Sequence, residues 1–175
     1  MNKLKRQFGA AFVELLKKSP TLVKDIADIR RAGVKIRRVK GKHAFAESNP
    51  KSKIIWISAD CHPAYQLTAI AHEKYHVLTR VSPDAEPDFI SRENYIRQCL
   101  ACELGAKKAE LKVAAELVAA GVKLDSHTAH WLKVSKLGDK ALQREMRKAV
   151  TSTTGENYRQ YYGTVWDEAL DALYD

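Results

Sequence analysis

The sequence predicts an α+β domain that is mostly helical, with a small sheet of about three strands in front of a motif-bearing helix. Apolar residues recur at helical spacing near both ends of the chain, whereas residues 34–59 change to the alternating, β-branched pattern of strands. With 175 residues, 45% of them hydrophobic and 29% charged, the chain has the size and composition of one globular domain. We therefore expect a single domain over residues 1–175.

Residues 1–33 predict helices. In "KLKRQFGAAFVELLKK" and in "SPTLVKDIADIRRAG" the apolar residues fall every three or four positions, and Ser19, Pro20 and Gly33 punctuate the two stretches. The period then changes in "VKIRRVK", "HAFAES" and "SKIIWISA", which are short and rich in β-branched or aromatic residues. The chain should open with helices and continue into the sheet, which we place at 34–59.

Two longer helices should follow the sheet. Pro63 is favourable in a first helical turn, and a helix over about 63–80 would stop before the next Ser-Pro pair. The acidic, proline-rich segment "SPDAEPDF" then reads as a loop. A second helix is expected over about 91–120, capped by Ser91 and ended by Gly121.

The remainder of the chain, 126–174, predicts two or three more helices. They centre on "HTAHWLKVSKLG", "DKALQREMRKAV" and "GENYRQYYGTVWDEALDALY". The last is expected to begin after Thr153, with Glu156 as its capping-box partner. No internal repeat or low-complexity tract interrupts this order.

The segment "IAHEKYHVLTR" contains the candidate metal ligands and the candidate general base. Residues four apart on an α-helix lie on one face, so the imidazoles of His72 and His76 can converge on one ion while Glu73 flanks it. Zinc suits this pattern because it accepts neutral imidazole nitrogen and lowers the pKa of a bound water. Glu73 is then placed to accept the proton of that water. The pattern favours a Zn²⁺ site over a pair of structural histidines.

A catalytic zinc usually has three protein ligands, so one more must come from another segment. Glu103, in "CLACELGAKKAE", is the favoured residue, because small neighbours such as Gly105 would let its helix approach the first closely. Two other glutamates compete: Glu93 can instead serve a helix dipole, and Glu110 fits an exposed ladder with the neighbouring lysines. A histidine or an aspartate elsewhere also stays open as the third ligand.

These motifs resemble the zincin metallopeptidases, in which a helix bears HExxH and a following helix supplies a glutamate. The likeness covers about residues 34–120 and is nearest to small bacterial members of toxin or effector type. It implies hydrolysis of peptide bonds in a protein or a cell-wall stem peptide, with His72, His76 and Glu103 as zinc ligands and Glu73 as general base. No third histidine follows at a short fixed distance, so the metzincin pattern is excluded.

The effector-type resemblance also bears on partners and location. It implies a peptide or protein substrate, and a cognate immunity or inhibitor protein as a further partner. The basic N-terminus is interrupted by charges and reads as an amphipathic helix, not a signal peptide, and no apolar run reaches the length of a membrane span. We therefore expect a cytoplasmic protein, or one exported without a cleavable signal peptide.

Three other groups of residues can carry function, but packing explains each of them more simply. Cys99 and Cys102 form a single CxxC with no second half, and no acid or cysteine completes a site with His127 and His130. The aromatic stripe that begins at Tyr158 has helical spacing and predicts a packed face. Within it, Tyr162 is our candidate for a catalytic hydroxyl that stabilises the oxyanion, with the following alternatives: Tyr161, His62 and Tyr65.

The net charge of +9 favours contact with an anionic polymer, such as nucleic acid or a cell-wall polymer, or with an anionic membrane surface. This supports an alternative function, a nucleic-acid-associated regulatory or repair protein in which a zincin-like fold acts through its basic surface. The sequence contains no zinc ribbon and no aromatic and basic alternation of the kind that binds single strands. The peptidase is therefore the favoured function.

Overall fold

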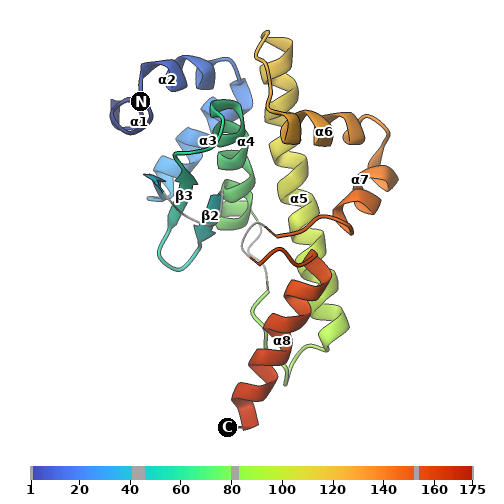
Figure 1. Cartoon of the computed structure of the whole chain (residues 1–175). Coiled ribbons are helices and arrows are strands. Elements are labelled where there is room, and N and C mark those ends of the chain that lie inside the picture. Colours follow the sequence, from blue (N-terminus) through green and yellow to red (C-terminus); the bar gives the residue numbers. More distant parts are fainter. Residues whose placement is uncertain (1, 41–45, 80–82, 152–153, 175) are drawn as a thin grey trace.

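The computed structural model describes residues 2–40, 46–79, 83–151 and 154–174 (Figure 1). It confirms an α+β, mostly helical fold with a small three-stranded sheet. The elements, in chain order, are α1 (Asn2–Phe8), α2 (Ala10–Lys17), α3 (Pro20–Arg31), β1 (Lys35–Val39), β2 (Ala46–Asn49), β3 (Ile54–Ser58), α4 (Pro63–Lys74), the π-helical turn η1 (Tyr75–Thr79), α5 (Arg92–Ala119), α6 (Ser126–Ser135), α7 (Asp139–Met146) and α8 (Tyr158–Tyr174).

The N-terminal segment forms three helices where the sequence predicted two. Gly9 has φ of 92° and ends α1, because this left-handed conformation is open to glycine and breaks the helical path. The boundary at Ser19 is as expected, since its hydroxyl accepts a hydrogen bond from the N–H of Leu22 at 3.1 Å. The apolar faces of all three helices, including Phe12 and Leu22, are buried in the core.

The sheet has the strand order β1-β3-β2, with β1 parallel and β2 antiparallel to β3. Ile55 and Ile57 of the central strand are completely buried and point to the side covered by helices. The residues of "HAFAES" before Ala46 lie outside the described residues, but the strand itself is confirmed. Among the described strands β2 is consequently an edge strand, and its residues line the cleft described below.

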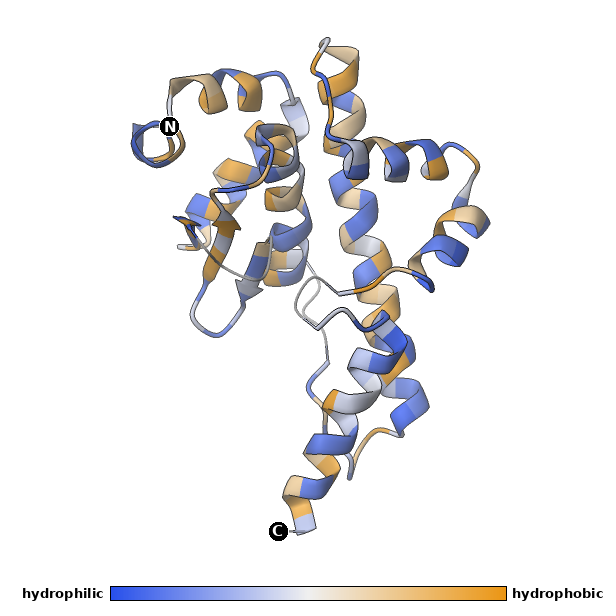
Figure 2. Ribbon diagram, in the orientation of Figure 1, coloured by the Kyte–Doolittle hydropathy of each residue, from blue (hydrophilic) through white to orange (hydrophobic). Residues whose placement is uncertain are grey.

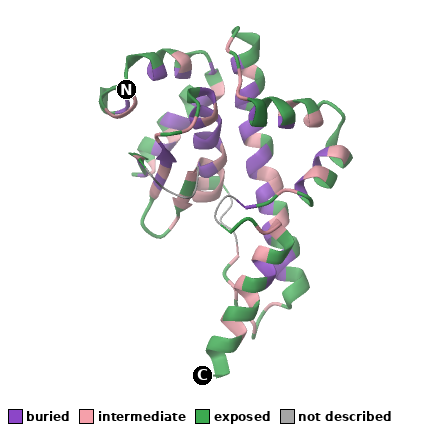
Figure 3. Cartoon of the chain, in the orientation of Figure 1, coloured by how far each residue is buried: buried purple, intermediate pink, exposed green. Residues whose placement is uncertain are grey.

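Helix α4 lies between the sheet and the long helix α5 (Figure 1). It is buried on nearly every side: of its residues 64–71 only Tyr65 is partly exposed, which agrees with the apolar core visible in Figures 2 and 3. The α-helix expected over about 63–80 ends at Lys74, and the chain continues as the π-helical turn η1. A π-turn widens the helix by one residue and is common at functional sites, and this one contains His76.

Helix α5 joins three hydrophobic clusters. It supplies Val113 and Leu117 to the main core with the sheet and α4, Leu111 to a cluster with α6 and α7, and Tyr95 and Ile96 to a cluster with α8. The close approach of α5 to the motif segment requires Gly105. A Cβ at this position would come within 2.2 Å of the hydroxyl of Tyr75 on η1. The expectation that small residues bring α5 close to the motif is confirmed at this glycine.

The last helix begins later than the sequence suggested. α8 starts at Tyr158, so Glu156 precedes it and the expected capping box is wrong; Thr153 lies outside the described residues. A capping box does form, one turn on: Asn157 Oδ1 accepts from Gln160 N at 3.0 Å, and Gln160 Oε1 accepts from Asn157 N at 3.4 Å. The cap fixes the start of the helix that carries Tyr162 to the site.

Candidate metal centre

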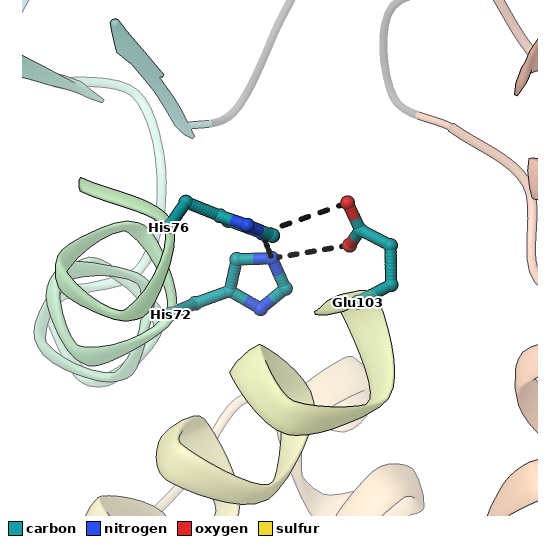
Figure 4. Close-up of side chains that lie close together, drawn as sticks. All are labelled: His72, His76 and Glu103. Atoms are coloured by element: carbon teal, nitrogen blue, oxygen red, sulfur yellow. Dashed lines mark hydrogen bonds and ion pairs between the residues drawn. The ribbon is translucent and has the colours of Figure 1, made fainter. Parts of the chain in front are cut away.

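Three side chains from three helical elements lie close together (Figure 4). His72 comes from α4, His76 from η1 and Glu103 from α5. The two histidine Nε2 atoms are 3.2 Å apart, and they face different oxygens of Glu103: Nε2 of His72 lies 3.5 Å from Oε2, and Nε2 of His76 lies 3.5 Å from Oε1. The three residues that the sequence assigned as metal ligands are therefore brought together.

These spacings fit a zinc ion. Bonds of about 2.0–2.1 Å in tetrahedral geometry place neighbouring ligand atoms about 3.3–3.4 Å apart. The Nε2–Nε2 distance of 3.2 Å is close to that value, and so are the two distances of 3.5 Å to Glu103, which end on Oε2 for His72 and on Oε1 for His76. Two imidazole nitrogens and a carboxylate oxygen are also a donor set that zinc accepts, and one position remains for water or substrate. This group could hold a metal ion.

Each of these three residues has a second partner outside the group. Nδ1 of His72 lies 3.2 Å from Glu110 Oε2, and Nδ1 of His76 lies 3.4 Å from the sulfur of Cys102. Tyr162 donates its hydroxyl hydrogen to Glu103 Oε1 at 2.6 Å. Such contacts hold both imidazoles with Nε2 toward Glu103 and fix its carboxylate, as outer partners do for the ligands of metal sites.

Glu110 is not the exposed residue that the sequence suggested. It is 3% exposed, its Oε2 pairs with the ammonium of Lys107 at 2.6 Å, and that ammonium lies 4.9 Å from the ring centroid of Trp131. Burial alone would raise the pKa of Glu110, but the charges of Lys107 and His72 lower it to about 2. Glu110 is thus a buried carboxylate that supports His72, and its pairing with Lys107 lies inside the protein.

The other competitor for the third ligand is excluded from the site. Glu93 lies on the surface, where it pairs with Arg159 at 2.8 Å. Among the remaining candidates, His130 pairs with Glu145 at 3.1 Å, and His127 packs edge-on against Tyr65 and Trp131. In the part of the chain that the structure describes, His72, His76 and Glu103 are the one group able to hold a metal ion.

Glu73, the expected general base, lies beside this group. It is 7% exposed, and it lines with His72, His76 and Glu103 a cleft of about 530 Å³. A second cavity of about 310 Å³ adjoins it and is lined by Glu73, Glu110 and Lys107, among others. Glu73 therefore lines both the cleft and the second cavity.

Tyr162 reaches the site, but its observed contact differs from the predicted one. Its hydroxyl is engaged with Glu103, and burial together with this carboxylate raises its pKa, which keeps the hydroxyl protonated as a donor. The ring is 9% exposed and stacks on Tyr158. In this structure Tyr162 positions the carboxylate; stabilisation of an oxyanion stays a prediction.

The two roles of Tyr162 are separable with Tyr162→Phe. If the hydroxyl only positions Glu103, zinc affinity should fall about 10–100-fold while turnover recovers at saturating zinc. If it stabilises the oxyanion, a loss of about 10²–10³-fold in kcat should persist at saturating zinc. Zinc titration and peptide turnover measure both quantities. Tyr161→Phe, which lines the same cleft, is the matched control and should leave zinc affinity unchanged.

Protons compete with metal at this site. Burial disfavours a charged imidazole, but the carboxylates of Glu103 and Glu110 raise the pKa of His72 to about 9, and Cys102 and Glu103 raise that of His76 to about 10. Burial likewise raises the pKa of Glu103, but its hydrogen bonds with the histidines lower it below its usual range. Because zinc binds neutral imidazole, its binding must displace protons at neutral pH.

Zinc should consequently raise the melting temperature more at about pH 9 than at about pH 6. In the metal-free protein the histidine contribution to stability is complete below the ordinary pKa of 6.5 and is lost as pH rises through about 9–10. The zinc complex gains affinity over the same range, so the two melting curves separate. Thermal denaturation with and without zinc measures the difference. A zinc shift that stays constant or shrinks with pH would contradict this reading, and magnesium, which prefers oxygen ligands, should give no shift.

Several site residues were missed by sequence reasoning. The sequence treated Cys102 as core and Glu110 as solvated, yet both contact the histidines. One signal was available: Glu103, Lys107 and Glu110 are spaced i, i+4 and i+7, which places them on one helical face. No comparable signal marks Cys102, because its contact depends on how closely α5 approaches η1.

Comparison with known proteins adds no relative to this picture. No family model, no curated protein and no solved structure matches the chain. Among the described residues, no helix combines the length and the apolar character needed to cross a bilayer. The resemblance to zincins therefore stays a hypothesis from the sequence, based on the HExxH motif and the glutamate of the following helix.

Proposed function

We propose that this protein is a zinc-dependent metallopeptidase. The observation that carries the proposal is the close grouping of His72, His76 and Glu103 beside the buried carboxylate of Glu73 in one open cleft. A zinc ion bound there supplies Lewis acidity, which polarises the substrate carbonyl and acidifies water. The ligands are neutral imidazoles and a carboxylate, a set that occurs in catalytic zinc sites with an open position.

Glu73 provides the acid–base chemistry. Its carboxylate accepts a proton as water attacks the carbonyl carbon, and it returns that proton to the amine nitrogen as the C–N bond breaks. His72 and Glu73 are adjacent on α4, so the base is held at a fixed place beside the ligands. Burial by α5 excludes most solvent from this carboxylate, which strengthens its electrostatic interactions with reacting groups.

The cleft suits a peptide in extended conformation. Every residue from 46 to 51 lines it, and alternate side chains of a strand point to opposite faces, so β2 presents its edge to the cleft. In the part of the chain that the structure describes, this edge pairs with no other strand. A substrate can therefore add a strand through backbone hydrogen bonds and lay a peptide bond beside Glu73. This supports a peptide substrate over a small molecule.

The proposal is tested by assaying the purified, zinc-loaded protein on mixed unfolded proteins, a random peptide library and isolated cell-wall stem peptides. We expect new peptide termini in at least one of them, detected by mass spectrometry. A chelator should abolish the cleavage and zinc should restore it. Cleavage that survives full removal of the metal would contradict the proposal, as would zinc-loaded protein that cleaves none of the three classes. The classes also separate a protein substrate from a cell-wall peptide.

The effector-type resemblance extends the proposal to the biological setting. A toxin that cleaves proteins or stem peptides would need a cognate inhibitor in the cell that makes it. The cleft is open at the β2 edge, so an inhibitor could occupy the place of the substrate strand. Co-expression with a neighbouring gene product that relieves growth inhibition is the corresponding observation.

A further inference from the structure

The net charge of the protein is confined to its first 40 residues. These residues hold 12 of the 30 Lys and Arg residues but three of the 21 Asp and Glu residues, which gives +9. The remaining 135 residues hold 18 of each kind and are neutral overall. The asymmetry is a property of one structural part, because α1, α2, α3 and β1 lie together on the side of α4 away from α8 (Figure 1).

Most of these N-terminal cations are not neutralised by acids. The acids of this segment are already engaged: Asp28 pairs with Lys24 at 2.8 Å and with Arg31 at 3.5 Å, and Asp25 pairs with Lys74 at 3.1 Å. A second group of exposed cations forms no ion pair with any described residue. We name this group the N-terminal basic surface; it consists of Lys3, Lys5, Arg6, Arg30, Lys35, Arg37 and Lys40.

Basic residues of three separate elements line one hollow. Lys3 of α1, Arg30 of α3 and Lys35 of β1 all line a cavity of about 310 Å³ between these elements. Gln7 lines the same hollow, and its buried Oε1 makes no hydrogen bond with the described residues. A side-chain amide can be turned to present its NH₂ group instead, which would give a phosphate oxygen a neutral donor among the cations.

Strand β1 extends the surface beyond the hollow. Ile36 is buried, whereas Lys35 and Arg37 on either side of it are exposed. Because β1 is an edge strand, no strand covers its outer side in the described chain. The cations thus form a band that includes residues of α1, the end of α3 and β1.

The band lacks what a membrane surface would need. Stable interfacial binding combines cations with apolar side chains that insert among the lipids. Here the apolar residues of α1 and α2, such as Leu4, Phe12 and Leu16, are buried in the core. Val23 is the sole large hydrophobic side chain exposed within residues 2–40. The surface therefore presents positive charge without apolar side chains that could insert into a membrane. Such a surface suits the regularly spaced phosphates of nucleic acid.

We propose that the N-terminal basic surface binds the phosphate backbone of duplex nucleic acid, as a second function beside the metal centre. Lysine and arginine that neutralise phosphates release counterions, and this supplies affinity without base recognition. The band shares no residue with the proposed catalytic cleft, which is lined by β2 at the other edge of the sheet from β1. Binding would hold the protein on a polyanion and leave the cleft open for a peptide substrate.

The test compares two variants of equal charge. The first replaces Lys3, Lys5, Arg30, Lys35 and Arg37 with glutamine, and the second replaces five exposed cations of the C-terminal half, Lys123, Lys133, Lys136, Arg144 and Arg147, with glutamine. Both lower the net charge from +9 to +4. Fluorescence anisotropy with a short labelled DNA duplex, repeated with an RNA duplex of the same sequence, measures affinity at several salt concentrations. Circular dichroism and zinc content establish that each variant is folded.

The first variant should bind the duplex at least about 10-fold more weakly than the unaltered protein. The slope of its log affinity against log salt concentration should also be shallower, by the equivalent of about three to five phosphate contacts. The second variant should bind within about 3-fold of the unaltered protein, since its cations lie elsewhere. Equal loss in both variants, or no duplex binding by the unaltered protein at low salt, would overturn the proposal. Binding to vesicles containing phosphatidylserine without binding to a duplex would also overturn it. Glu73→Gln should bind the duplex normally, so this result is independent of peptidase activity.

Discussion

His72→Ala and His76→Ala should each remove nearly all zinc from the purified protein. The unaltered protein should carry about one zinc per chain, because three ligand atoms converge on one point. Loss of either imidazole leaves one nitrogen and one carboxylate, and a water cannot restore the lost bond to a comparable strength. Since losing an outer partner of a ligand already costs about 10–100-fold in affinity, losing a ligand should cost more than about 100-fold. Metal analysis after exhaustive dialysis measures the difference.

His130→Ala is the matched control for this experiment. His130 is an exposed histidine on α6 that pairs with Glu145 at 3.1 Å, and it lies outside the metal group. Its replacement should leave zinc content unchanged. Full zinc occupancy in a protein lacking both His72 and His76 would mean that the ion binds elsewhere.

The glutamates test the third ligand in the same assay. Glu103→Ala should release zinc far more readily than Glu93→Ala, because Glu93 pairs with Arg159 on the surface. Glu110→Gln should lie between the two, since it keeps the shape of the side chain but weakens the support of His72. Equal zinc retention in all three variants would remove Glu103 from the ligand set.

Glu73→Gln should abolish activity and leave the metal in place. Glutamine keeps the size and nearly the helix propensity of glutamate, so both imidazoles stay where they are, but it cannot accept the proton of the attacking water. Losing a positioned general base costs about 10²–10⁴-fold in turnover, which corresponds to about 3–5 kcal/mol of barrier. Peptide turnover, or growth inhibition if the protein is toxic, should register this loss.

The same variant separates the two functions considered for this chain. Zinc content and the melting curve of Glu73→Gln should match those of the unaltered protein, which shows that the base is not a ligand. A scaffold acting through its basic surface would keep its full biological effect in Glu73→Gln. If the variant retains zinc and the full effect, the peptidase proposal fails and the N-terminal basic surface becomes the principal site.

The metal group could be predicted because its information is largely local. His72 and His76 are one helical turn apart, and this spacing alone brings their rings to one face. Glu103 followed from a weaker signal, the small residues around it, and Gly105 proves to be where α5 meets Tyr75. The three strands were equally readable, since their alternation and β-branched residues act over a few positions.

The outer partners of the site could not be read in the same way. Cys102 and Glu110 contact the histidines because α5 crosses α4 and η1 at one particular depth, and that depth is set by packing throughout the core. The hydroxyl of Tyr162 arrives from a helix 59 residues away in sequence from Glu103. Such contacts depend on tertiary structure, which overrides the local preference of each residue.

At two helix ends the structure differs from what the sequence pattern predicted. Gly9 breaks the first helix although the apolar spacing continues through it, because the chain must turn to bring both apolar faces to the core. The π-turn after Lys74 shifts His76 relative to an ideal α-helix, and periodicity alone does not report such a shift. Both features adjust a predicted helix to the packing around it.

The most direct test of the metal centre is a crystal structure of the zinc-loaded protein with anomalous scattering measured at the zinc edge. We expect one strong peak bonded to Nε2 of His72, Nε2 of His76 and a carboxylate oxygen of Glu103, at about 2.0–2.2 Å. Glu110 Oε2, the sulfur of Cys102 and the hydroxyl of Tyr162 should stay outside the first coordination sphere. A zinc-loaded crystal with no peak between α4 and α5, or with the ion on other residues, would contradict the account.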